Sequence, residues 1–266
     1  MIKLAFMNQK GGVGKSTASF IIAGELAITF GKRVLVVDGD EQRSVTNAFL
    51  SKDEEYLESP ESCKDIVDVL GGARVADCIR SVTYIKKGLF GREEGEYNID
   101  ILPARAEQND VTLENYLILR EKLQEVEPFY DYVIIDLPPA LTDIAASLLA
   151  TTDYVVAPVE VGLFSLMGYS DLLDSINSIQ SSLNPSISIL GLFFSRVNEN
   201  AKFHNHIINA FEGKIFETRI NNSIKVQECP MEAPLCIYAP SCKAAKQYRE
   251  LTKEIMQDID NHEKQK

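Results

Sequence analysis

Short apolar runs recur along the chain, separated by stretches with helical spacing. The runs cover residues 2–7, 33–37, 99–102, 132–135, 154–159 and 187–194. Most of their positions are apolar, not only alternate ones, which is typical of strands that are covered on both faces. We therefore predict an α/β fold with one mainly parallel, twisted sheet and helices on both faces. In such a fold, ligands bind at the carboxyl ends of the strands.

The pattern predicts one domain over residues 1–266, because we find no internal repeat and no linker rich in Pro, Gly or Ser. Residues 51–98 form the least regular segment and read as an insertion, with a turn at Gly71-Gly72 and a hairpin at 86–91. We expect the acidic stretches 53–58 and 93–96 to be solvated loops.

Composition narrows the class of protein. Hydrophobic residues make up 45% of the chain and charged residues 25%, as in ordinary globular proteins. A formal net charge of −12 argues against a surface that coats nucleic acid, although a local basic patch remains compatible with it. The five cysteines form no C-x-x-C pair, so neither a disulfide framework nor a zinc site is indicated. With no run of 18 apolar residues and no signal-peptide pattern, we expect a cytoplasmic protein.

A glycine-rich loop follows the first apolar run and precedes an apolar helical stretch at residues 19–27. Strand, loop and helix in this order place phosphates at a helix N-terminus, which favours anions. Lys15 is expected to reach the β- and γ-phosphate oxygens and Ser16 to ligate Mg²⁺. The nucleotide-binding residues expected here are Lys10, Gly11, Gly12, Val13, Gly14, Lys15, Ser16 and Thr17. A plain strand-to-helix connector is the alternative, and the two lysines in register argue against it.

Two further apolar runs end in acids. Asp38 and Asp40 follow the run at 33–37, where their side chains can diverge because the strand ends there. Without the glycine loop, both would be interpreted as caps of the next helix.

The run at 132–135 ends in Asp136, which makes a Walker B signature in which the carboxylate holds Mg²⁺ through water. Pro138 and Pro139 follow it and fix two φ angles, so they form a stiff turn able to respond to the γ-phosphate.

The loop pattern K-G-G-x-G-K-[ST]-T, with its second lysine, resembles the deviant Walker A loop of the ParA/MinD ATPase family. This resemblance implies a slow, partner-stimulated ATPase that uses ATP and Mg²⁺. It implies that Lys10 crosses a dimer interface to the nucleotide of the other subunit. In the family's switch I pattern D-x-D-P-Q, Asp40 would orient the attacking water and Asp38 would help to hold the Mg²⁺ shell and the loop. Arg43 departs from that pattern, since relatives have glycine there.

The resemblance extends toward the nucleotide base. Glu228-Cys229-Pro230 is similar to the family's E-A-P, which implies that Pro230 borders the base. Ser223 stands where many relatives have an asparagine beside the adenine, so the adenine contacts of this chain stay open.

The chain is most similar to the ParA branch, the short-form ParA and Soj partition ATPases. Its last helix has an acidic polar face, which disfavours lipid, so we expect its apolar stripe to pack on the domain. Starting at the strand before the loop, the chain has no room for an N-terminal helix-turn-helix. The resemblance implies a homodimer in the ATP state, nucleoid association through nonspecific DNA, a ParB-like centromere-binding partner and no membrane.

Lys225 falls where relatives have a DNA-contacting arginine, so we predict a DNA contact there. Other cations could extend the patch: Lys202, Lys214, Arg219, Lys243 and Lys246. Two alternatives remain open. One is a nucleotide-gated adaptor that positions a protein cargo, and the other is a MinD-like cell-division regulator.

Overall fold

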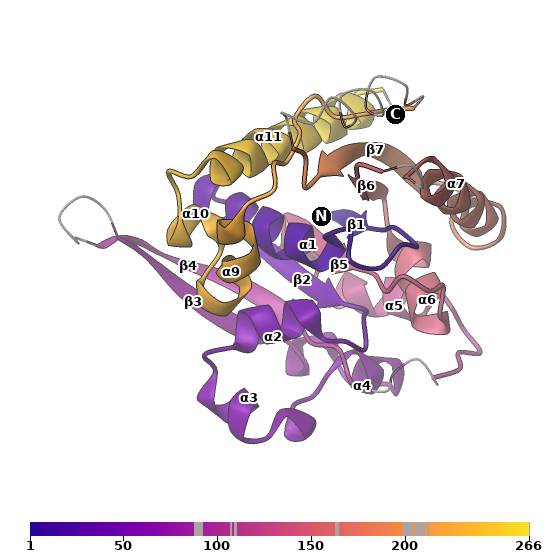
Figure 1. Cartoon of the computed structure of the whole chain (residues 1–266). Helices are drawn as coiled ribbons and strands as arrows, with labels where there is room; N and C mark the ends of the chain where they lie inside the picture. Colours follow the sequence, from indigo (N-terminus) through magenta and orange to yellow (C-terminus); the bar gives the residue numbers. More distant parts are fainter. Residues whose placement is uncertain are drawn as a thin grey trace.

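The computed structural model describes residues 1–87, 93–106, 108, 111–162, 165–198, 204, 208, 211 and 213–265. Figure 1 shows a twisted central sheet with helices packed on both faces. Within the described residues, no helix combines the length and apolar character needed to span a bilayer.

The sheet has seven strands in the order β3-β4-β2-β5-β1-β6-β7. They are β1 (Ile2–Phe6), β2 (Val34–Asp38), β3 (Arg80–Lys87), β4 (Glu93–Leu102), β5 (Tyr132–Asp136), β6 (Tyr154–Glu160) and β7 (Ser188–Ser195). All neighbouring pairs are parallel except β3 and β4, which are antiparallel. The predicted fold class is therefore confirmed.

Alternation along the strands builds two cores, one on each side of the sheet. In β1, Leu4 and Phe6 point into the first core and Ala5 into the second. Helices α1, α2, α10 and α11 bury side chains in the first core, and α4 to α7 do so in the second (Figure 1). Because both faces are covered, β2 and β5 are buried at every position.

The helices begin and end as follows: α1 (Lys15–Gly24), α2 (Ser44–Leu50), α3 (Glu54–Glu58), α4 (Ile66–Leu70), α5 (Ile118–Leu123), α6 (Asp143–Thr151), α7 (Ser165–Ser182), α9 (Ile224–Glu232), α10 (Leu235–Tyr238) and α11 (Lys243–Glu263). A π-helical turn, Glu25–Thr29, continues α1. Helix α1 starts four residues before the predicted stretch, because the end of the glycine loop is already helical.

Both acidic stretches were wrongly expected to be loops. Asp53 caps α3 by accepting a hydrogen bond from the Tyr56 N–H at 3.0 Å, and it pairs with Arg80 at 3.0 Å. Glu93 and its neighbours belong to β4, which pairs with β3 as the predicted hairpin. The turn of that hairpin, residues 88–92, lies outside the described residues.

The apolar stripe of α11 packs on the domain, as expected. Tyr248, Leu251, Ile255 and Ile259 are each at most 3% exposed and belong to the first core. Their burial follows from the spacing of apolar side chains along one helix face.

Candidate functional site

The sheet order brings the three predicted motifs to one edge. Strand β5 lies between β1 and β2, and Asp136 pairs in register with Phe6 on one side and Asp38 on the other. The glycine loop leaves β1 at this level. Parallel strands therefore place the loop, the two acids after β2 and Asp136 side by side.

The glycine loop is open toward solvent. Gly12 and Gly14 have φ values of 77° and 97°, a left-handed conformation that glycine adopts without a Cβ penalty. A Cβ added at either glycine would meet no atom within 4 Å. The Asn8 side chain braces the loop, since its amide donates to the Pro158 carbonyl at 2.8 Å and its Oδ1 accepts from the Lys10 N–H at 2.9 Å.

A pocket of about 340 Å³ lies in front of the loop. It is lined by Gly11, Gly12, Gly14, Lys15, Ser16, Thr17, Asp40, Gln42, Ser44, Pro139 and Arg196. The Lys15 side chain is buried, and burial lowers its pKa against the opposing charges of Asp136 and Asp40. A buried ammonium beside an open cradle of loop backbone suits a polyphosphate.

Asp136 presents a free oxygen at this edge. Its Oδ1 accepts a hydrogen bond from the Ser19 hydroxyl at 3.0 Å, whereas its Oδ2 is buried without a partner in the described chain. Burial and the charge of Asp38 raise the pKa of Asp136. An orphaned carboxylate oxygen near the Ser16 hydroxyl fits Mg²⁺, which takes few protein ligands and completes its shell with water and phosphate. The described residues contain no group of three or more His, Cys, Asp or Glu side chains placed to hold a metal ion.

Asp38 and Asp40 diverge, as the end of the strand allows. Asp38 is fully buried and accepts bonds from the Asp40 N–H at 3.0 Å and from the Thr46 N–H and hydroxyl at 2.8 Å each. It thus holds the switch loop, and its predicted part in the Mg²⁺ shell stays a prediction. Asp40 lines the pocket in front of the glycine loop, and its Oδ1 accepts from the Gln42 N–H at 3.0 Å.

Arg43 occupies the family's glycine position in a left-handed conformation, with φ 54° and ψ 31°. The loop therefore keeps a glycine-like backbone turn before α2. For a residue with a Cβ, this conformation costs about 1–2 kcal/mol.

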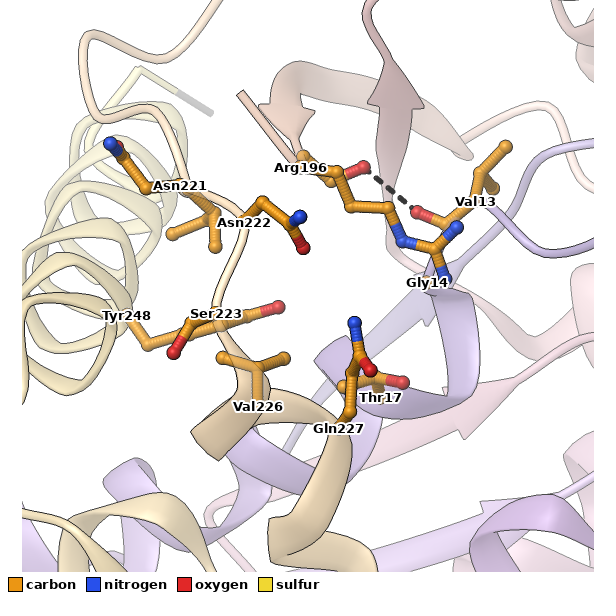
Figure 2. Close-up of a pocket in the computed structure, with 12 residues that line it drawn as sticks. Val13, Gly14, Thr17, Arg196, Asn221, Asn222, Ser223, Val226, Gln227 and Tyr248 are labelled. Atoms are coloured by element: carbon orange, nitrogen blue, oxygen red, sulfur yellow. Dashed lines mark hydrogen bonds between the residues drawn. The ribbon is translucent and has the colours of Figure 1, made fainter. Parts of the chain in front are cut away.

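A second pocket shares Gly14, Thr17 and Arg196 with the first and extends to residues of α9 and α11. Figure 2 shows this second pocket. It is lined by Val13, Gly14, Thr17, Ser195, Arg196, Ile220, Asn221, Asn222, Ser223, Val226, Gln227 and Tyr248. Ser223 lies in this lining, but Pro230 does not. Pro230 sits further along α9, within the helix. The proposed base contact of Pro230 stays a prediction.

Sequence reasoning missed several polar residues of these pockets, among them Arg196, Asn222 and Gln227. A signal existed for Arg196, because it directly follows β7 and residues after parallel strands line ligand sites. No comparable signal marked Asn222 or Gln227, which reach the pocket only through the path of the chain into α9.

The two lysines with predicted intermolecular roles lie at the surface. Lys10 is half exposed, and its Nζ is 3.8 Å from the Glu160 Oε2. Lys225 donates to Glu228 at 2.8 Å and to the Tyr238 hydroxyl at 3.0 Å, and these bonds raise its pKa. The predicted DNA contact thus already has an acidic neighbour.

The other cations of the predicted patch differ in their surroundings. Lys214 pairs with Asp258 at 3.2 Å. Arg219 and Lys246 are exposed, and Lys202 lies outside the described residues.

Comparisons with known proteins show the family and the fold of this chain. Residues 1–189 match the family model described as an AAA domain. The chain is 30% identical over 264 residues to the chromosome-partitioning ATPase Soj of Treponema pallidum, covering 95% of this chain and 96% of that protein.

Two solved structures share the fold. One is cobyrinic acid a,c-diamide synthase from Mycobacterium smegmatis with bound ATP analog and magnesium, with a TM-score of 0.74 and 21% identity over 98% of this chain and 96% of the other. The second is a putative plasmid partition protein from Borrelia burgdorferi bound to AMPPNP, with a TM-score of 0.72 and 21% identity over 98% of both chains.

Proposed function

This chain belongs to the AAA-domain family of ParA/MinD type, and we propose that it is a Mg²⁺-dependent ATPase that positions DNA as an ATP-bound dimer. A ParB-like centromere-binding partner would stimulate hydrolysis and so release the DNA. The observation that carries nucleotide and metal binding is the buried Asp136 carboxylate, whose Oδ2 has no hydrogen-bond partner in the described residues, at the same sheet edge as the open glycine loop.

Four residues in or beside the pocket in front of the glycine loop, which we call the phosphate pocket, have distinct proposed parts. Lys15 neutralises phosphate charge, the Ser16 hydroxyl and Asp136 hold Mg²⁺, and Asp40 orients the attacking water. Bound Mg²⁺ would neutralise charge that develops on the phosphate oxygens. Asp38 supports these steps by fixing the loop that carries Asp40. Because phosphoryl transfer depends mostly on positioning, this support matters for rate.

Dimerisation is proposed to depend on Lys10. Its ammonium is half exposed at the mouth of the loop and pairs only loosely with Glu160, so it is free to reach a second subunit. An exposed pair of this kind contributes little, so the pairing is easily exchanged for a phosphate of the partner's nucleotide.

DNA binding is proposed to depend on a local basic surface. With a net charge of −12, the chain can bind a polyanion only through a local basic surface, which a dimer would present twice. Lys225 would contribute to that surface. The Glu228 carboxylate, 2.8 Å from its ammonium, would have to give way to a DNA phosphate.

Retardation of random duplex DNA at about 50 mM salt distinguishes these functions. We expect retardation only with ATP and Mg²⁺, steep weakening with salt, and loss in Lys225→Glu with unchanged ATP-dependent dimerisation. Lys253→Glu is the matched control, since Lys253 is an exposed lysine on α11 with the same kind of glutamate neighbour, Glu250. Absence of ATP-dependent binding in the wild type would favour the protein-cargo adaptor. Binding that survives in Lys225→Glu would place the DNA contact elsewhere.

A further inference from the structure

Arg196 has an unusual backbone conformation. It and Arg43 are the two non-glycine residues with positive φ in the described chain, and the φ of Arg196 is 52°. Its neighbours fix this conformation. The Ser195 hydroxyl donates to the Val13 carbonyl at 2.9 Å, and the Val197 N–H donates to the Ile220 carbonyl at 2.9 Å. Strain of this kind persists where the surrounding structure enforces it, often at functional sites.

The strained turn places the Arg196 side chain where the two pockets meet. Gly14, Thr17 and Arg196 line both the phosphate pocket and the pocket beside α9. In Figure 2 the guanidinium reaches across the cavity toward Gly14, while the side chain of Gln227 enters from the opposite side. A nucleotide with its phosphates on the glycine loop and its base near α9 would pass under this guanidinium.

The charged residues that line the two pockets leave Arg196 available to bind an anion. Lys15, Asp40 and Arg196 are the charged residues of the described linings. Lys15 already faces the charges of Asp136 and Asp40. Within these linings, the charge of Lys15 is therefore offset by Asp40, whereas the charge of Arg196 has no acid beside it.

The acid that does pair with Arg196 lies at the rim and is shared. Glu160 Oε1 is 3.7 Å from Arg196 Nη1, and Glu160 Oε2 is 3.8 Å from Lys10 Nζ. All three side chains are at least one third exposed, so both pairs are weak. A phosphate, which a guanidinium can bind through two parallel hydrogen bonds, is the stronger partner.

We propose that Arg196 is a nucleotide-binding residue that contacts the phosphate chain, and that Glu160 competes with the nucleotide for Arg196 and Lys10. This inference rests on the nucleotide binding proposed above and adds a residue outside the glycine loop.

Equilibrium titration of a fluorescent ADP analogue tests this inference. Arg196→Asn removes the guanidinium but keeps a residue that tolerates the left-handed conformation, and Arg196→Lys retains the charge. We expect Arg196→Asn to weaken binding about tenfold or more, the loss of one charge-assisted contact, and Arg196→Lys to lose much less. Glu160→Gln should bind a few-fold tighter, because the competing carboxylate is gone.

Two results would overturn the inference: wild-type affinity in Arg196→Asn, or weakening in Arg196→Asn and Arg196→Lys that is matched by a fall in melting temperature of both variants, which would mark a structural role. Thermal melting of each variant without nucleotide reports folding separately. Lys15→Ala distinguishes this inference from the proposed function. If Lys15→Ala also binds the analogue like the wild type, the phosphate-loop assignment fails. If only Arg196→Asn binds like the wild type, the inference alone fails.

Discussion

A buried ion pair joins the phosphate-loop helix to the C-terminal helix, and its removal gives a quantitative prediction. Glu25, in the π-helical turn after α1, is fully buried, and its Oε2 is 3.4 Å from the Nε of Arg249 on α11. Its Oε1 is buried without a partner in the described residues. Arg249→Met removes the cation but keeps an apolar stem, so a buried carboxylate is left unpaired.

The size of the effect follows from distance and exposure. Two unit charges 3.4 Å apart attract by about 5 kcal/mol at an effective dielectric constant near 20, an upper bound. The Arg249 side chain is 37% exposed, so water screens it. We therefore expect Arg249→Met to lower the free energy of unfolding by about 2 kcal/mol, below the roughly 3–5 kcal/mol for a fully buried pair. The melting temperature should fall by about 4–8 °C.

Glu25→Gln, unlike Arg249→Met, should not lower the free energy of unfolding at pH 8. Burial raises the pKa of Glu25 despite Arg249 and Thr29. The folded protein then binds this proton more readily than the unfolded chain, so stability falls as pH rises from the ordinary glutamate pKa through the raised pKa. Glu25→Gln removes this contribution, so at pH 8 it should be at least as stable as the wild type. In the Glu25→Gln background, Arg249→Met should lower the free energy of unfolding only slightly.

Urea unfolding of the four proteins of this cycle at pH 5 and pH 8 is the assay. Arg33→Met is the control, because Arg33 and Asp131 form an exposed pair with 2.7 Å between Nη2 and Oδ1. Arg33 lowers the pKa of Asp131 to about 2, yet the pair is exposed to solvent, so Arg33→Met should lower the free energy of unfolding less than Arg249→Met does at pH 8. If Arg249→Met lowered the free energy of unfolding equally in the wild type and in Glu25→Gln, the proposed pairing of Glu25 with Arg249 would be wrong.

Three further variants test the phosphate pocket and its loop. Lys15→Ala should lose ATP binding by at least about 30-fold in an equilibrium titration, because phosphate charge is left uncompensated; wild-type affinity would remove the phosphate-loop assignment. Asp40→Ala should retain ATP while phosphate release slows at least about 100-fold, since only water orientation is lost; unchanged turnover would exclude that role. Arg43→Gly should raise the free energy of unfolding by about 0.5–1 kcal/mol in urea, since relief of the left-handed strain exceeds the entropy cost of glycine; a loss of stability would show that the Arg43 side chain contributes more than its backbone costs.

The apolar runs predicted the parallel strands well, because strands buried on both faces leave a continuous signature in the chain. The motifs likewise predicted which acids meet the glycine loop, because β1, β2 and β5 are adjacent and end at one edge. Short elements were harder. Helix α3 has five residues and depends on the Asp53 cap and on Arg80, so its acidic composition suggested a loop.

The sequence also did not predict the long-range contacts of the site. Arg196 reaches the site because Ser195 bonds to Val13, 182 residues away, and such a contact requires knowledge of the sheet order. The position of Asp38 under the switch loop depends on Thr46, whose hydroxyl also accepts from the Ala104 N–H at 3.0 Å. No local pattern indicates either contact.

In the proposed cycle, ATP converts this chain into a dimer through Lys10. Light scattering on the Asp40→Ala protein with ATP and Mg²⁺ measures this directly, since slow hydrolysis should let the complex accumulate. We predict that the mass doubles from the 29.7 kDa of one chain, and that adding Lys10→Ala returns it to the monomer while nucleotide binding persists. A monomer in the presence of saturating ATP would show that ATP does not cause dimerisation, and a dimer that survives Lys10→Ala would show that Lys10 does not hold the dimer together.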